Sequence, residues 1–269
     1  MPELPEVENI CRSLEKYFVG KTIIFAKVRN NNLKFPISKE IFNIRNQKIL
    51  SINRRSKYLI MKLNQGSIII HLGMSGTLRI VSLKTSYYKH DHIDLVMNNK
   101  TILRYTDPRK FGSWRWSDNP DMCEYIKKLG PEPLSTNFSV DYLFQKTRSS
   151  NLGVKPFLMN TKFVAGIGNI YANESLFLAG ILPFRKILTL NWTETQKLVE
   201  SIVIVLQCSI NNGGTSLQDF CHLDGKKGNF SKLLNVYGRT GKSCNQCGRF
   251  IERIILQQRS TFFCRNCQI

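Results

Sequence analysis

Four cysteines near the end of the chain have the spacing of a metal site. Cys244 and Cys247 form one Cys-x2-Cys pair, and Cys264 and Cys267 form a second pair after 16 intervening residues. Two such pairs at this separation match a four-thiolate zinc finger, in which each pair presents its sulfurs from a tight turn. The sequence therefore predicts one structural Zn²⁺ whose coordination is filled by protein ligands, so that the ion stabilises a β-hairpin and activates no water.

The remaining cysteines are scattered, and no targeting segment stands out. They are Cys11, Cys123, Cys208 and Cys221. Because their spacing forms no disulfide framework, we interpret them as reduced and mostly buried thiols, and the sequence assigns them no redox role. No apolar run approaches the roughly 18 residues of a membrane span, and the first residues are acidic without a signal-peptide core. We expect a cytoplasmic or nucleoid protein with no membrane partner.

The net charge indicates a polyanionic partner. Lys and Arg number 39 against 19 Asp and Glu, which gives a formal charge of +20. A surface this basic favours nucleic acid, although charge alone does not separate DNA from RNA. The sequence is long enough, and at 42% hydrophobic apolar enough, to bury the core of one large or two modest domains.

Hydrophobic periodicity predicts the helix and the strands in the first half of the chain. Residues 4–17 carry an apolar helical stripe, ended by Gly20, that consists of Leu4, Val7, Ile10, Leu14 and Tyr17. Short β-branched and aromatic runs follow at residues 22–28, 57–63, 67–72, 92–97 and 100–105. We expect these runs to form an antiparallel β-sandwich.

The second half of the chain has a helical texture. After the Gly-Pro-Glu-Pro segment at 130–133, residues 139–212 read as helices, with the clearest ones at 171–179 and 192–210. Residues 213–242 are polar and Gly/Lys-rich, so we expect an exposed, mobile connection before the cysteine-flanked hairpin. The predicted fold class is α+β: an N-terminal β-sandwich flanked by helices, a helical domain and a C-terminal zinc-finger β-hairpin.

Several separated motifs resemble those of bacterial formamidopyrimidine-DNA glycosylases. They are PELPEVE at 2–8, RRSKYL at 54–59, HLGMSG at 71–76, DPRKFG at 107–112, GIGNIYANE at 166–174 and VYGR at 236–239, followed by the finger. The resemblance implies three domains: a catalytic β-sandwich at 1–131, a helix-two-turn-helix DNA-binding domain at 132–222 and a zinc finger at 235–269. It also implies a monomer that acts on damaged double-stranded DNA.

The resemblance implies a bifunctional enzyme with an N-terminal nucleophile. Pro2, freed by removal of Met1, would attack C1′ of an oxidised purine nucleotide, such as 8-oxoguanine opposite cytosine or a formamidopyrimidine. An α-amine with a pKa of about 7.7–8 keeps an unprotonated fraction near neutral pH. The resulting Schiff base would lead to β- and δ-elimination, with catalytic roles for Glu3, Lys57 and Arg259 and a supporting role for Glu6. Read alone, a proline in a first helical turn is simply a good helix start.

DNA contacts are likewise implied by the matched motifs. The expected DNA-binding residues are His71, Met74, His90, Arg109, Phe111, Asn151, Lys155 and Asn169. A flipped base leaves a hole in the stack, and Met74, Arg109 and Phe111 match the family's void-filling trio. Asn151 departs from the family, which often has a basic residue there. Residues 216–230 resemble the family's lesion-capping loop.

Alternative interpretations stay open at this point. Endonuclease VIII shares the scaffold, Pro2 and the zinc site but removes oxidised pyrimidines. Leu4-Pro5 and the void-filling trio favour the purine enzyme. A non-catalytic DNA-binding protein or an RNA-binding zinc protein would bind without cleaving. A metal pair at His90 and His92 is a further alternative, but alternate strand positions without a third ligand argue against it.

Overall fold

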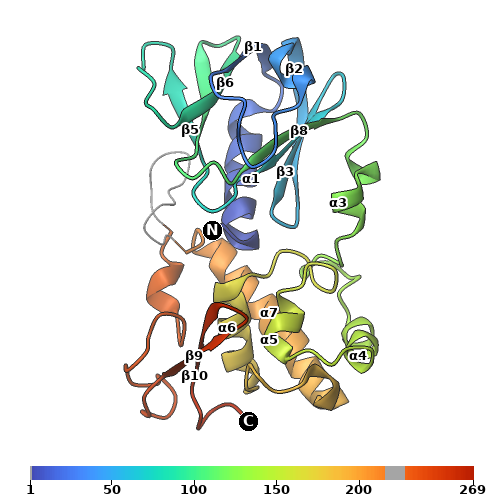
Figure 1. The fold of residues 1–269 in the computed structure, drawn as a ribbon, viewed down its shortest axis with the longest axis vertical. Coiled ribbons are helices and arrows are strands. Elements are labelled where there is room, and N and C mark those ends of the chain that lie inside the picture. The colour runs from blue at the N-terminus through green and yellow to red at the C-terminus, as the bar shows by residue number, and fades with distance from the viewer. Residues whose placement is uncertain (1, 216–227) are drawn as a thin grey trace. The chain divides into compact units, whose positions relative to one another are not determined.

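A computed structural model describes residues 2–215 and 228–269 (Figure 1). They divide into two compact units. Unit 1 consists of Met1–Lys127 and Gly213–Asn229, and unit 2 of Lys128–Asn212 and Phe230–Ile269. No helix in the described ranges is long and apolar enough to cross a membrane.

Unit 1 is built on an antiparallel sheet, which has eight strands within the described residues. Their order is β5-β7-β6-β1-β2-β3-β4-β8. The strands are β1 (Thr22–Val28), β2 (Arg45–Arg55), β3 (Tyr58–Leu63), β4 (Ser67–His71), β5 (Thr77–Ser82), β6 (Asp91–Met97), β7 (Thr101–Thr106) and β8 (Ser113–Ser117). The helices are α1 (Leu4–Phe18), α2 (Lys39–Phe42), α3 (Glu124–Lys127) and the 3-10 turn η1 (Pro120–Met122).

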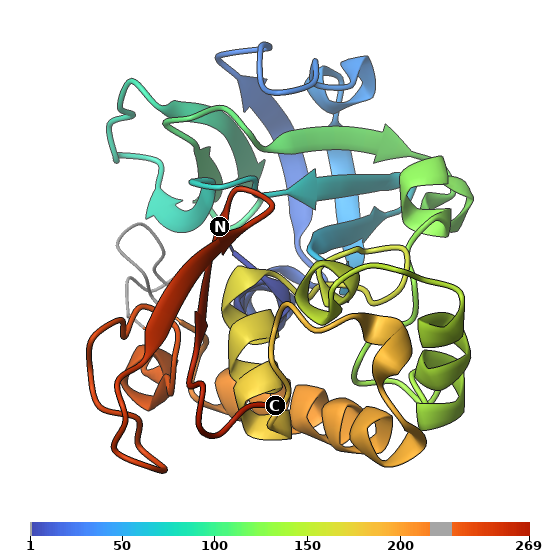
Figure 2. The same cartoon turned by 60° about the horizontal axis from the view of Figure 1, so that its bottom comes forward.

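The sheet folds back on itself and so forms the predicted sandwich. Tyr105 on β7 and Trp114 on β8 lie near opposite ends of the strand order, yet their ring centroids are 5.4 Å apart. Both rings are fully buried in one apolar core that also contains Val7, Ile10 and Leu14 of α1. The crossing of the strands is visible in Figure 2. Apolar burial on this scale is the main force that holds the two halves of the sheet together.

The end of α1 differs from the predicted apolar stripe. Tyr17 is 49% exposed, whereas its neighbour Phe18 is 1% exposed and belongs to the core. Phe18 follows Leu14 by four residues and stays within the stripe, while Tyr17 lies past its edge. The helix does end before Gly20, which has a φ of +84°. The stripe was therefore right for four of its five residues.

Unit 2 is helical with a terminal hairpin. Its helices are α4 (Val140–Arg148), α5 (Val154–Leu158), α6 (Asn169–Ala179) and α7 (Trp192–Asn211), with 3-10 turns η2 (Ile187–Thr189) and η3 (Phe230–Leu233). Its strands are β9 (Glu252–Leu256) and β10 (Arg259–Phe263). α7 begins with a capping box in which Asn191 and Glu194 bond each other's backbone N–H groups. One core lies between the helices, and a smaller one lies beneath the finger.

The connection to the finger corrects the prediction for residues 213–242. Within the described part, Phe230, Leu234 and Val236 are buried, so this stretch is not an exposed connection. The buried carboxylate of Glu174 on α6 accepts hydrogen bonds from the backbone N–H groups of Val236 at 2.9 Å and Tyr237 at 2.8 Å. The buried carboxylate of Glu174 thus takes the place of water as the hydrogen-bond acceptor for these backbone N–H groups. Residues 216–227, which include Cys221, lie outside the described residues.

Candidate functional site

The first residues of α1 are held by one carboxylate. Pro2, Glu3 and Glu6 are all buried. Oε2 of Glu6 accepts a hydrogen bond from the backbone N–H of Glu3 at 2.9 Å, and Oε1 accepts one from the backbone N–H of Thr215 at 2.7 Å. Glu6 therefore fixes the backbone beside Pro2 against a segment that is distant in sequence but belongs to the same unit.

The turn that carries Lys57 is fastened to the same helix. Ser56 and Lys57 connect β2 to β3, and Ser56 has a φ of +55°. Arg54 donates from Nε to Oε2 of Glu8 on α1 at 2.7 Å and from a terminal nitrogen to the carbonyl of Ser56 at 3.0 Å. Burial raises the pKa of Glu8, but the hydrogen bonds and charges of Arg54 and Arg12 outweigh burial and lower it overall. The ionised pair thus links Lys57 to the helix of Glu3.

Asp107 is the polar centre of two neighbouring loops. Its carboxylate, with the residue 0% exposed, accepts hydrogen bonds from the hydroxyls of Ser75 at 2.6 Å and Tyr105 at 2.9 Å. It also accepts the backbone N–H groups of Arg109 at 3.2 Å and Gly112 at 2.9 Å. One side chain therefore shapes the loop that carries Arg109 and Phe111 and ties it to the loop that carries Met74.

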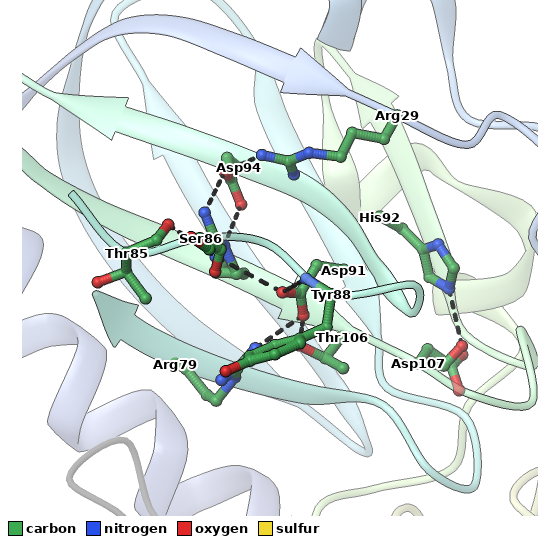
Figure 3. Close-up of polar contacts among 11 residues, drawn as sticks. Arg29, Arg79, Thr85, Ser86, Tyr88, Asp91, His92, Asp94, Thr106 and Asp107 are labelled. Atoms are coloured by element: carbon green, nitrogen blue, oxygen red, sulfur yellow. Dashed lines mark hydrogen bonds and ion pairs between the residues drawn. The ribbon is translucent and has the colours of Figure 1, made fainter. Parts of the chain in front are cut away.

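The backbone of Asp107 extends this arrangement to two histidines. Its N–H donates to the carbonyl of His90 at 3.0 Å, and its carbonyl pairs with Nε2 of buried His92 at 2.8 Å (Figure 3). His92 is therefore a structural residue, and the metal-pair interpretation for His90 and His92 gains no support.

The three predicted void-filling residues lie on these two loops and face solvent. Met74 is 42% and Phe111 49% exposed, and Arg109 is exposed as well. Large apolar side chains are usually buried, so their exposure on adjoining loops indicates a contact surface. The loops meet through backbone: a Cβ on Gly73, which has a φ of +65°, would lie 2.4 Å from the carbonyl carbon of Phe111. Glycine is required at this approach.

A buried ion-pair network orders the loop before His90 (Figure 3). Arg104 is 2% exposed, donates from Nε to Asp94 at 2.8 Å and reaches the loop carbonyl of Ser86 at 2.8 Å. Asp91 accepts the backbone N–H of Tyr88 at 2.9 Å. Burial raises the pKa of Asp94, but hydrogen bonds from Arg29 and Arg104 outweigh that and lower it. The paired charges thus hold the loop by its backbone at Ser86 and Tyr88.

His71 is a neutral hydrogen-bond donor. Burial, and then the positive charges of Lys57 and Lys34, lower its pKa from 6.5 to about 4. Its Nδ1 accepts the backbone N–H of Gly73 at 3.1 Å, so the ring proton resides on Nε2. A neutral Nε2–H can bond a phosphate oxygen without contributing charge.

In unit 2, three predicted residues lie at or beside the backbone carbonyl of Ser260. Lys155 is buried, and its Nζ donates to the carbonyl of Ser260 at 2.9 Å and to Thr261 at 2.6 Å. The amide of Asn169, the first residue of α6, donates to the same carbonyl at 3.1 Å. Arg259 adjoins Ser260 and lies exposed on a cavity of about 360 Å³ that Lys155 also lines.

Asn151 is exposed between α4 and α5, apart in the sequence from the Ser260 cluster. No role was predicted for Asp107 or Ser75, although they lie inside the motifs at 107–112 and 71–76. The available signal was a single acidic residue between a strand and Pro-Arg-Lys. Pro2, Glu3, Lys57 and the void-filling residues belong to unit 1, while Asn151, Lys155, Asn169 and Arg259 belong to unit 2.

The four finger cysteines converge as the spacing predicts. The Sγ atoms of Cys244, Cys247, Cys264 and Cys267 all lie within 4.8 Å of one another. A backbone hydrogen bond from Arg249 is the main cause that lowers the pKa of Cys247 to about 7, whereas burial raises that of Cys264. Four thiolates this close repel one another, and a divalent cation relieves that repulsion. The donor set fits one tetrahedral Zn²⁺.

Three scattered cysteines are described, and all are free thiols. Cys11 is buried, and burial raises its pKa to about 12, so it carries no reactive thiolate. Cys123 and Cys208 are half-buried. The prediction of reduced thiols holds for these three, but the prediction of mostly buried ones holds only for Cys11.

Three family profiles match the chain. They are the formamidopyrimidine-DNA glycosylase N-terminal domain at residues 1–114, the formamidopyrimidine-DNA glycosylase H2TH domain at 129–221, and the zinc finger found in FPG and IleRS at 241–269. The formamidopyrimidine-DNA glycosylases of Yersinia pseudotuberculosis and Yersinia pestis are 54% identical over 268 residues, covering 100% of both chains.

Solved structures with the same fold include complexes with damaged DNA. A Lactococcus lactis FPG bound to DNA that contains Fapy-dG has a TM-score of 0.93 at 36% identity and covers 99% of each chain. A MutM complex with carbocyclic 8-oxo-G DNA has a TM-score of 0.92, also at 36% identity and 99% coverage of each chain. MutM from Thermus thermophilus has a TM-score of 0.90 at 34% identity, covering 99% of this chain and 98% of that one.

Replacing Asp107 by Asn tests the polar centre of the two loops. Each carboxylate oxygen accepts two donors, so an amide nitrogen at either position would face N–H or O–H groups. We expect a loss of about 2–3 kcal/mol in the free energy of unfolding, measured by urea denaturation. Asp118→Asn, at an exposed acceptor for Trp116, is the matched control and should change it by less than about 0.5 kcal/mol. Equal effects would contradict a special role for Asp107.

The neutral state of His71 predicts a pH dependence. The unfolded chain takes up this proton near pH 6.5 and the folded chain only near pH 4. The unfolded state therefore binds more protons between these values, and the stability that neutral His71 contributes is present above pH 6.5 and is lost as the pH falls towards 4. NMR titration of the imidazole, assigned with His71→Gln, should show no midpoint above pH 5. A midpoint near 6.5 would refute this.

Removing one finger ligand tests the zinc site. We expect about one zinc per wild-type chain and almost none in Cys264→Ser, measured by inductively coupled plasma mass spectrometry after gel filtration. Cys208→Ser, which alters a half-buried thiol outside the finger, should retain its zinc. Full zinc content in Cys264→Ser would show that this thiol is not a ligand.

Proposed function

Because this chain belongs to the formamidopyrimidine-DNA glycosylase family, we propose that Pro2 is the nucleophile with which it excises oxidised purines from duplex DNA. It is a DNA glycosylase with AP lyase activity, and solved relatives hold DNA that contains Fapy-dG, 8-oxo-G or an abasic site. The observation that carries the residue assignment is the Asp107 cluster, which supports two loops bearing exposed Met74, Arg109 and Phe111.

The chemistry requires a free secondary amine on Pro2, and therefore removal of Met1. The nitrogen lone pair forms a bond to C1′ of the damaged nucleotide as the bond from C1′ to the base breaks, and the base leaves with a proton. Opening of the sugar ring then gives an iminium ion at C1′. This electron sink acidifies the C2′ proton, whose loss expels the 3′ phosphate, and a second elimination expels the 5′ phosphate.

Charged residues supply proton transfer and phosphate contacts in this proposal. Glu3, adjacent to the nucleophile, protonates the sugar ring oxygen as a general acid. Glu6 acts as a positioning residue, since its carboxylate holds the Glu3 backbone. Lys57 serves proton transfer during elimination, and Arg259 contacts the phosphate that leaves second. The link from Arg54 to Glu8 supports a fixed placement of Lys57.

Base extrusion is supported by the exposed loop residues. Unstacking a base costs a few kcal/mol, and two apolar side chains that already face solvent lose little by entering the hole. In the proposal Met74 and Phe111 fill the stack, while the guanidinium of Arg109 bonds the orphaned cytosine. The sugar–phosphate backbone of the DNA is contacted by His71, His90, Asn151, Lys155 and Asn169. Asn151 makes its contact without a charge.

The finer organisation of the protein is part of the proposal. We infer a monomer with domains at 1–131, 132–222 and 235–269, working on the nucleoid in a bacterial cytoplasm. Free thiols at Cys11, Cys123 and Cys208 support a reducing compartment. The zinc ion cross-links the finger and so holds the hairpin that carries Arg259.

Borohydride trapping tests the nucleophile. On a duplex with one 8-oxoguanine opposite cytosine, wild type should form a reduced covalent adduct, because borohydride converts the iminium to a stable amine. Pro2→Gly, and a form with extra residues before Pro2, should yield at least about 10²-fold less adduct. The readout is the shifted band on a denaturing gel.

Other substrates separate the alternatives. An adduct only with an oxidised pyrimidine would assign the protein to the endonuclease VIII type. Binding without any adduct would leave a non-catalytic DNA-binding protein, and full trapping by the extended form would exclude the Pro2 amine.

A further inference from the structure

A second cavity is lined by residues of unit 1, among them Arg115, which has no role in the proposed reaction. It measures about 320 Å³, and its wall includes Phe35, Tyr58, His71, Phe111, Arg115 and Tyr125. Lys34 and Ser113 complete the lining. Aromatic rings and cations therefore share this wall, and no acidic residue does.

The outer face of the sheet builds the floor of this cavity. Tyr58 on β3 pairs with His71 on β4, which pairs with Ser113 on β8. Arg115 follows Ser113 by two residues and so projects from the same face, while the intervening Trp114 points into the core. The site is thus set by strand register on rigid elements, which favours precise placement of its groups.

Arg115 is held by aromatic rings and has no acidic partner among the described residues. The centre of its guanidinium lies 4.3 Å from the ring centroid of Phe35 and 4.7 Å from that of Tyr125. Within residues 2–215 and 228–269, no carboxylate pairs with it and no oxygen accepts a hydrogen bond from it. The two rings contact the guanidinium without accepting conventional hydrogen bonds, so its N–H donors stay available to a ligand.

The surrounding groups leave the cavity positively charged. Lys34 and Arg115 are cationic, and the positive charge of Lys34 contributes to keeping His71 neutral. Burial raises the pKa values of Tyr58 and Tyr125, so neither phenol supplies negative charge. Two cations with a hydroxyl and a neutral imidazole suit an oxyanion, for which a guanidinium edge is the favoured protein donor.

We propose that this cavity binds a backbone phosphate of the DNA duplex through Arg115. The inference rests on the proposed function, since it takes Phe111 as the residue that enters the base stack. Phe111 lines the same cavity, so the phosphate belongs to a nucleotide that adjoins the extruded base's position. The volume exceeds that of a phosphate alone, and the rings of Phe35 and Tyr58 suit the apolar face of the attached deoxyribose.

Salt dependence of binding gives the first test. Equilibrium binding to a duplex with a non-cleavable abasic analogue is measured over a range of salt concentrations for wild type, Arg115→Ala, Arg115→Lys and Arg45→Ala. Arg115→Ala should bind about tenfold more weakly, and its log Kd against log[salt] slope should fall by about 1. Arg115→Lys should retain the slope with weaker binding. Arg45, which is exposed beside Phe25, loses the same charge and should leave slope and affinity unchanged.

Methylphosphonate scanning locates the phosphate. Neutralising one phosphate at a time in each strand should reveal a position that weakens wild-type binding and has no further effect in Arg115→Ala. Thermal unfolding of each variant establishes that the lost affinity does not come from unfolding. If Arg115→Ala matches wild type in affinity and slope, the proposal is wrong.

Three outcomes separate this proposal from others. Normal borohydride trapping by wild type together with unchanged binding by Arg115→Ala would overturn the phosphate site and leave the proposed function intact. Absence of both trapping and binding in wild type would overturn both. If inorganic phosphate binds at Arg115 without DNA, but every methylphosphonate acts equally in wild type and Arg115→Ala, the cavity serves a free anion and the DNA proposal is wrong.

Discussion

The buried carboxylate of Asp107 is the constraint on which the exposed half of the proposed site depends. A buried carboxylate must be matched by hydrogen-bond donors, and here two hydroxyls and two backbone N–H groups supply them. Those donors come from both loops and from the strand beneath them. The apolar side chains of Met74 and Phe111 can therefore stay in solvent without the loops collapsing, because polar bonds inside fix the backbone that carries them.

Elsewhere, too, buried polar side chains hold segments that carry residues proposed to contact DNA. Arg104 and its carboxylates sit inside the sheet and hold the loop before His90, and Lys155 lies buried below the exposed Arg259. Breaking such buried pairs costs several kcal/mol, whereas exposed single charges contribute little to stability. A strongly basic chain can thus keep part of its charge for structure and present the rest to a polyanion.

Sequence reasoning predicted what depends on local pattern and on motif. Strands β1, β3, β4, β6 and β7, helices α6 and α7, and the zinc cysteines follow from periodicity and spacing, whereas β2, β5 and β8 were not predicted. The family is confirmed. Tyr17 was misplaced because a stripe edge depends on the packing partner. The stretch around Val236 was misread because Glu174, 62 residues earlier, accepts a hydrogen bond from its backbone. Asp107 and Arg115 could not be found because their partners come from separate strands. The roles of the individual site residues stay predictions.

The bond between Glu6 and Thr215 has a consequence for how the chain is made. Unit 1 is discontinuous, since its last segment follows α7. At about 5–20 residues per second, a ribosome completes that segment roughly 5–20 s after the sheet. The backbone around Pro2 is therefore assembled only when most of the proposed DNA-binding residues have been synthesised. A nascent or truncated chain would carry an N-terminal amine but not its finished surroundings, so synthesis itself delays the arrival of a reactive enzyme until it can bind its substrate.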